Sequence, residues 1–291
     1  MKINCHRFEL ILLLLLTSMF CRAGDIVINN NPQDKTIVFG NSKIMITLDY
    51  NQKCNVSGLT INGQKVISGP AGIFSEIRTP ENTYSTLKLT SDPTIKIGKN
   101  SVSIENIKYG NNQEIAIENW NFTITENDIR FEIERELPKP IHVEEAAFPT
   151  FHFDNINTWN GAFLGYGGLA WFYLFNEKLC TYGVHTDQSV FWNSSTGNAL
   201  QVDISAQGKK VAMKYSRSED DHLVYNIAVS DKEMTPRYEK EKRSRFIRKK
   251  TDVWDSFTLS SGKYTETITL TYMDYNEKYN RGNLVGINGR D

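Results

Sequence analysis

Several chemical signatures are absent from this 291-residue sequence. It contains no phosphate-binding loop, no dinucleotide-binding glycine fingerprint and no nucleophile elbow, so it gives no support to phosphoryl, hydride or acyl transfer. Its five histidines lack the spacings of metal-ligand sets, and no cysteine-containing zinc pattern accompanies them. We therefore expect neither a metal nor a cofactor.

Cysteine is scarce in the chain. Of the four cysteines, Cys5 and Cys21 belong to an N-terminal leader, which leaves Cys54 and Cys180 in the remainder. So few cysteines exclude a fold that depends on a disulfide framework. One bridge between Cys54 and Cys180 and two buried free thiols both remain open, because each cysteine lies in an apolar or strand-like setting.

Excess charge of one sign and long apolar runs are also lacking. The formal net charge is −1, so no overall positive field points to nucleic acid. The apolar run over residues 10–16 is shorter than the roughly 20 residues of a membrane-spanning helix. We expect no nucleic-acid partner and no transmembrane segment.

This apolar run has the setting of a secretory signal. Lys2 and Arg7 precede it, and small and polar residues that suit cleavage after Ala23 follow it. We therefore predict a signal peptide over residues 1–23 and export to the periplasm or the cell exterior. Lipid attachment at Cys21 is the alternative, but bulky Phe20 stands where a lipoprotein signal has a small residue.

Short segments of alternating polar and apolar residues dominate the rest of the chain, and long amphipathic helices are missing. In residues 128–135 the isoleucines and the phenylalanine would share one strand face, while charged residues such as Arg135 would face or approach solvent. Turn-forming residues separate these segments. The pattern predicts an all-β fold, a large antiparallel β-sandwich, over residues 24–275, followed by a C-terminal linker over residues 276–291.

Residues 142–153 contain two adjacent carboxylates between two histidines. Glycoside cleavage uses paired carboxylates, which makes Glu144, Glu145 and His152 weak catalytic candidates, together with His185. Neighbouring strand residues point to opposite faces, so both glutamates could enter one site only at a bulge. The simpler interpretation leaves one glutamate in solvent and the other hydrogen-bonded at the sheet surface.

Aromatic residues and glycines are concentrated in residues 159–173 and 181–193. Sugars present apolar faces edged with hydroxyl groups, so flat rings flanked by polar groups suit them. Within this interpretation the carbohydrate-binding candidates are Trp159, Trp192, His185 and Asp187. The alternative is a packed core in which glycine allows close approach of the sheets.

A family resemblance rests on several segments: residues 39–63, which begin with Phe-Gly-Asn, 119–122 (Asn-Trp-Asn-Phe), 129–135, 254–259 (Trp-Asp-Ser-Phe-Thr-Leu), 265–272 and 275–283. They resemble the galactose-mutarotase-like β-supersandwich that precedes α-toroid catalytic domains in bacterial glycoside hydrolases. The resemblance covers most of the chain after the signal and implies that the acid and base lie mainly in the toroid. Epimerases of this fold use a histidine and a glutamate, but their motifs match no histidine or glutamate here, so no catalytic residue is carried over.

These observations lead us to expect an exported accessory module of a glycoside-hydrolase-type protein, active in polysaccharide degradation and without a complete catalytic site of its own. Its expected partners are a glycan or oligosaccharide and an α-toroid catalytic domain. One alternative is a self-contained sugar-active enzyme, an epimerase, glycosidase or lyase, with Glu144 or Glu145 and His152 or His185 as base and acid. The other is a glycan-binding protein of the cell envelope.

Overall fold

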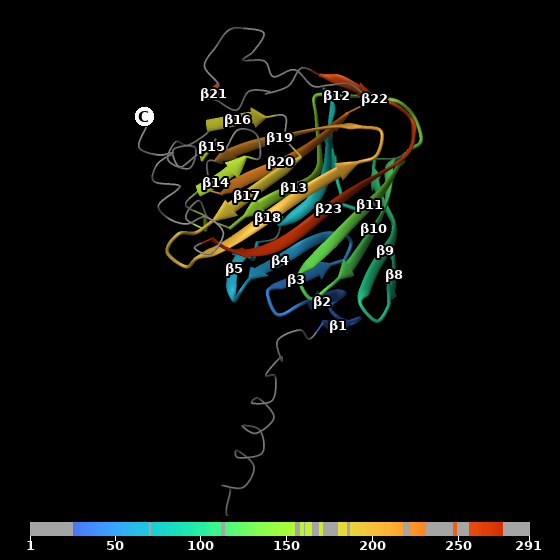
Figure 1. Ribbon diagram of the computed structural model, residues 1–291. Coiled ribbons are helices and arrows are strands. Elements are labelled where there is room, and N and C mark those ends of the chain that lie inside the picture. The colour runs from blue at the N-terminus through green and yellow to red at the C-terminus, as the bar shows by residue number, and fades with distance from the viewer. Residues whose placement is uncertain are drawn as a thin grey trace, which may run out of the picture.

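The computed structural model describes residues 26–69, 71–111, 114–154, 158–159, 161–164, 169–170, 180–184, 187–217, 222–230, 247–248 and 256–275. Over these residues the chain forms two large antiparallel sheets that pack as a sandwich (Figure 1), which confirms the predicted fold class. The predicted signal peptide (1–23) and linker (276–291) lie outside the described residues. Within those residues no helix has the length and apolar character needed to cross a membrane.

The larger sheet contains twelve of the described strands. Its main path runs β1 (Val27–Asn31), β2 (Thr36–Gly40), β3 (Ile44–Asp49), β4 (Asn55–Ile61), β6 (Ile73–Arg78), β13 (Glu145–Phe153), β20 (Leu223–Ser230), β19 (Lys210–Arg217), β16 (Cys180–Val184), β21 (Ile247–Arg248). Off this path, β5 (Gln64–Ile67) pairs with β4 and β7 (Thr83–Ser85) pairs with β6.

The second sheet contains nine described strands. Its order is β15 (Leu169–Ala170), β14 (Gly161–Leu164), β17 (Gln188–Trp192), β18 (Asn198–Ala206), β23 (Gly262–Asp274), β11 (Asp128–Leu137), β10 (Glu114–Ile124), β9 (Ser101–Gly110), β8 (Thr94–Ile97). A separate two-stranded sheet pairs β12 (Ile141–Val143) with β22 (Phe257–Leu259).

Strand alternation decides which side chains enter the core. On β11, Ile129, Phe131 and Ile133 are buried, whereas Arg130 and Glu134 are exposed. The face predicted from the sequence is therefore confirmed for this strand. Successive residues point to opposite sides of a sheet, so the apolar set of each strand can be buried against the other layer.

Aromatic rings join the two layers in the core. Phe122 on β10 stacks on Phe131 of β11 with 4.3 Å between ring centroids. Phe39, which belongs to the opposite sheet, approaches Phe122 to 4.9 Å. All three rings are buried, and removing such apolar surface from water is the main term that favours folding.

The expectation that Arg135 faces or approaches solvent is wrong, because its side chain has no exposed surface. Position 135 lies on the same strand face as Ile133, so alternation carries it into the core. There the guanidinium Nε donates to Glu118 Oε1 at 2.6 Å, and Nη1 lies 2.6 Å from both carboxylate oxygens of Glu266. Such a charge can be buried because the partners neutralise it and fill its donor sites.

Cys54, which directly precedes β4, is a buried free thiol. Burial raises the pKa of this thiol well above its usual value, since no water solvates the thiolate. Cys180 begins β16, and the order of the larger sheet places four strands between β4 and β16. For Cys54 the structure therefore supports the buried-thiol alternative.

Candidate functional site

The two adjacent glutamates predicted from the sequence meet the same arginine. Arg78, the last residue of β6, places Nε 3.3 Å from Glu144 Oε2 and Nη2 3.4 Å from Glu145 Oε2. Glu144 lies between β12 and β13 and belongs to neither strand. Strand alternation therefore does not apply at this position, and both carboxylates can turn toward one guanidinium.

Glu145 continues into a row of hydrogen bonds across neighbouring strands. Asn226 Nδ2 on β20 donates to Glu145 Oε1 at 2.8 Å, and Thr150 Oγ1 on β13 donates to Asn226 Oδ1. Thr150 and Asn226 are register partners. The next pair along the two strands, Phe151 and Tyr225, is buried in the core. The hydrogen-bonded side chains consequently lie on the outer face of the twelve-stranded sheet.

We call Arg78, Glu144, Glu145, Asn226 and Thr150 the polar row. The row becomes less exposed along its length: the side chain of Glu144 is 38% exposed, that of Arg78 27% and that of Glu145 14%. Asn226 and Thr150 are buried. Its Glu144 end is thus accessible to a ligand, while its other end is held by internal hydrogen bonds.

His152 lies two residues beyond Thr150 on the same face of β13. Its ring approaches Phe74 with 5.3 Å between centroids, and its backbone N–H donates to the carbonyl of Gly72 at 2.8 Å. Burial and, as the smaller cause, the nearby His222 together lower the pKa of His152 to about 4. His152 is therefore neutral near pH 7 and can both donate and accept a hydrogen bond.

The structure places the aromatic candidates in packed surroundings. Trp159 is fully buried between Phe153 and Phe191 of the core. Trp192 is 1% exposed and stacks on Tyr275 with 5.2 Å between ring centroids. Neither indole presents a face to solvent, and a role of either one in carbohydrate binding stays a prediction.

Asp187 is not brought to the polar row. Asp187 is exposed just before β17, in the nine-stranded sheet, whereas the row lies on the other sheet. His185 lies outside the described residues. Among the side chains that the structure describes, no group of three or more metal-ligating residues could hold a metal ion.

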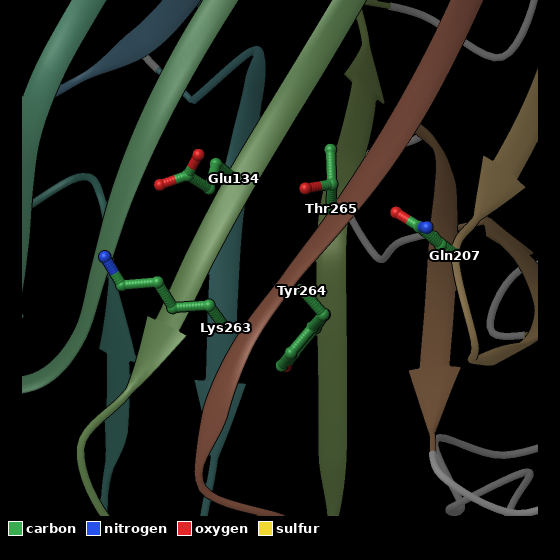
Figure 2. A pocket seen from close by; sticks show the side chains of 5 residues that line it. All are labelled: Glu134, Gln207, Lys263, Tyr264 and Thr265. Atoms are coloured by element: carbon green, nitrogen blue, oxygen red, sulfur yellow. The ribbon is translucent and has the colours of Figure 1, made fainter.

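A pocket that sequence reasoning missed lies on the outer face of the nine-stranded sheet (Figure 2). Glu134 from β11, Gln207 from the turn after β18, and Lys263, Tyr264 and Thr265 from β23 line a volume of about 380 Å³. Register pairing sets Glu134 opposite Thr265. Alternation marks both residues as outward-facing, but the sequence does not show that their strands are neighbours.

No protein-family model and no curated protein matches the sequence. Among solved structures, a 4-alpha-glucanotransferase from Thermococcus litoralis is similar over 85% of this chain and 39% of its own, with a TM-score of 0.50 and 10% identity. A TPR-domain-containing protein from Parabacteroides distasonis ATCC 8503 is similar over 82% of this chain and 47% of its own, with a TM-score of 0.52 and 9% identity.

A galactose mutarotase-like protein from Clostridium acetobutylicum is also matched, over 87% of this chain and 99% of its own, at 9% identity and a TM-score of 0.48. This chain spans less than half the length of the glucanotransferase and of the TPR-domain protein. At these low identities the likeness is one of fold alone.

Proposed function

We propose that this chain is an exported β-sandwich module that contacts carbohydrate through the polar row and serves as an accessory to a glycan-active enzyme. It has no complete catalytic site of its own, and its catalytic partner is a separate domain of the α-toroid type. That a glucanotransferase shares the fold supports the sugar-directed part of this proposal.

The observation that carries the proposal is that Arg78 holds Glu144 and Glu145 together at the accessible end of the row. A sugar carries adjacent hydroxyl groups that each donate and accept hydrogen bonds. Carboxylates accept from such groups, and a guanidinium donates to them from several fixed N–H groups. The Arg78–Glu144 end therefore offers both kinds of partner at one place on the sheet.

The arrangement favours binding over glycoside cleavage. A glycosidase sets two carboxyl groups on either side of the scissile bond, one as acid and the other as base or nucleophile. Here both carboxylates turn toward the same cation instead. The row can therefore orient hydroxyl groups without supplying the two opposed groups that hydrolysis requires.

The test screens the purified mature chain against plant, host and microbial glycans and records binding and release of reducing sugar together. We expect binding without release, and weaker binding in Glu144→Ala and Arg78→Lys. The matched control is Arg130→Lys, because Arg130 forms an exposed ion pair with Glu132 at 2.9 Å on the other sheet. Binding that is unchanged in both row variants would refute the proposed site.

A second candidate function is a self-contained sugar-active enzyme. It is favoured by the placement of Glu145 and the neutral His152 on one strand and one sheet face. An epimerase or lyase needs two proton-transfer groups within reach of one sugar. Release of reducing sugar or a change in optical rotation that disappears in Glu145→Gln and His152→Gln would establish this function in place of the first.

A further inference from the structure

The pocket of Figure 2 lies on the opposite outer face of the sandwich from the polar row. On β11 the residues flanking Glu134, namely Ile133 and Arg135, are buried, so Glu134 points away from the core. On β23 the buried residues Tyr264 and Glu266 flank Thr265 in the same way. Figure 2 shows Glu134 on one side of β23 and Gln207 on the other.

Polar contacts within the sheet hold the lining in place. The backbone N–H of Gln207 donates to the carbonyl of Thr265 at 3.1 Å, which ties the turn after β18 to β23. Lys263 Nζ lies 3.2 Å from Glu136 Oε2, and Asn119 Nδ2 donates to Glu134 Oε1 at 3.4 Å. The pocket is thus formed by strands in fixed register, which is the rigid support that a binding site needs.

The lining selects a class of ligand. Besides the buried Tyr264, its four lining side chains supply one carboxylate, one ammonium, one amide and one hydroxyl group, which together accept and donate hydrogen bonds. The positive charges of Lys263 and of Lys209, whose Nζ lies 4.6 Å from the ring centroid of Tyr264, are balanced by Glu136 and Glu134. The pocket therefore has no net positive charge to attract an anion such as phosphate or sulfate, and a neutral ligand with several hydroxyl groups fits.

The size of the pocket limits the ligand further. A volume of about 380 Å³ lies near the lower end of the range for small-molecule sites. We propose that this pocket is a second carbohydrate site, which takes a single neutral sugar unit independently of the polar row. The module would then contact glycan on both outer faces, and two linked contacts raise the overall affinity for a polymer.

The experiment titrates the isotope-labelled mature chain with glucose, galactose, mannose and N-acetylglucosamine in turn, and with sodium sulfate as the anionic probe. Backbone amide shifts of residues 134, 207 and 263–265 report the pocket. Because a ligand of about a dozen non-hydrogen atoms binds weakly, millimolar affinity is expected. One of the sugars should shift these amides, and sulfate should not.

The matched variants are Thr265→Val and Thr267→Val. Thr267 pairs with Glu132 one step farther along the same two strands and on the same face, outside the pocket lining. Loss of one neutral hydrogen bond should weaken sugar binding about five-fold in Thr265→Val. Thr267→Val should bind as the wild type does, and both variants keep a β-branched side chain that suits a strand.

Three results would overturn the second site: no sugar shifts the pocket amides, sulfate competes with the sugar, or the two threonine variants weaken binding equally. Glu144→Ala separates this proposal from the proposed function. If glycan binding depends on Glu144 but the pocket amides never respond, the second site alone fails. If the pocket responds and no glycan binding depends on Glu144 or Arg78, the polar row alone fails.

Discussion

Arg135 and Glu266 meet inside the sandwich, where Arg135 Nη1 lies 2.6 Å from both carboxylate oxygens of Glu266 and neither side chain has exposed surface. Nε of the same guanidinium donates a hydrogen bond to Glu118 Oε1. One buried cation thus faces two carboxyl groups. Burial raises the pKa of Glu266 to about 7, although Arg135 opposes this shift. With a proton on Glu266, the group carries no net charge.

The raised pKa of Glu266 predicts a particular pH dependence of stability. In the unfolded chain this carboxyl group loses its proton near 4.5, but the folded state holds the proton up to about 7. Between these values the native state binds more protons, so the free energy of unfolding falls as pH rises. The contribution amounts to at most about 3 kcal/mol.

Glu266→Gln removes this titration and keeps an acceptor for Arg135. The stability of the variant relative to wild type should therefore increase as pH rises from 4.5 through 7, as measured by urea unfolding at a series of pH values. Glu136→Gln is the control, because Glu136 is partly exposed on the outer face of the same sheet. Stability curves for wild type and Glu266→Gln that run parallel across this range would contradict the prediction.

Removal of the buried arginine Arg135 should lower the free energy of unfolding far more than removal of the exposed Arg130. Arg135→Met leaves the carboxyl groups of Glu118 and Glu266 buried without their cation, so we expect a loss of about 3–5 kcal/mol in the free energy of unfolding. Arg130→Met on the same strand removes an exposed arginine and should cost no more than about 1 kcal/mol. Urea unfolding near pH 7 measures both, and similar losses would show that the cluster does not stabilise the fold.

The sequence predicted the fold class because alternation is a local property. Residues 128–135 show which positions of β11 face inward without any knowledge of the neighbouring strands. The partners of Arg135 could not be predicted in this way, because β10 and β23 reach it only through the folding of the whole sheet. A charged residue at an inward position was therefore assigned to solvent instead of to an internal ion pair.

For the candidate sites too, the sequence shows individual residues but not the strand pairing that brings them together. Glu144 and Glu145 stand out in the sequence, but the strand break at Glu144 and the approach of Arg78 depend on the pairing of β6 with β13. The pocket was missed because Glu134 and Thr265 are ordinary outward residues until the register of β11 and β23 sets them opposite each other. No local motif marks such a pair.

His152 should contribute to stability with the opposite pH dependence from Glu266. Its pKa falls from 6.5 to about 4 on folding, so the unfolded chain binds more protons between these values. The contribution is fully present above pH 6.5 and is lost as pH falls through 4, by at most about 3 kcal/mol. Over part of this range it offsets the effect of Glu266, so variants reveal each contribution better than the wild type does.

His152→Gln should remove this loss at acid pH, whereas His142→Gln, at an exposed position of β12, should leave it unchanged. Urea unfolding between pH 4 and 7 measures the difference, and the imidazole resonance of His152 followed by NMR gives its titration midpoint directly. A midpoint near 6.5 would contradict the prediction and would remove the neutral imidazole from the second candidate function.

Alanine substitutions at Gly63 and Gly72 would distinguish the effect of backbone conformation on stability from the effect of close packing. Gly63 (φ +81°) has no atom within 4 Å of an added Cβ, whereas at Gly72 (φ +65°) the Cβ would lie 1.9 Å from the carbonyl oxygen of Val56. Gly63→Ala should therefore cost about 1 kcal/mol for its left-handed conformation alone. Gly72→Ala should cost about 3 kcal/mol, because a backbone carbonyl must also move.

The Gly72 variant has a second expected result, because the carbonyl of Gly72 accepts the backbone N–H of His152. Relief of the clash with Val56 should also shift the backbone of Gly72 and so weaken its hydrogen bond to His152. The titration midpoint of His152 should therefore rise from about 4 toward 6.5 in Gly72→Ala and stay unchanged in Gly63→Ala. Urea unfolding and NMR titration of both variants check these outcomes together. Equal stability losses with an unmoved His152 midpoint would show that the close contact between Gly72 and Val56 neither limits the fold nor positions the histidine.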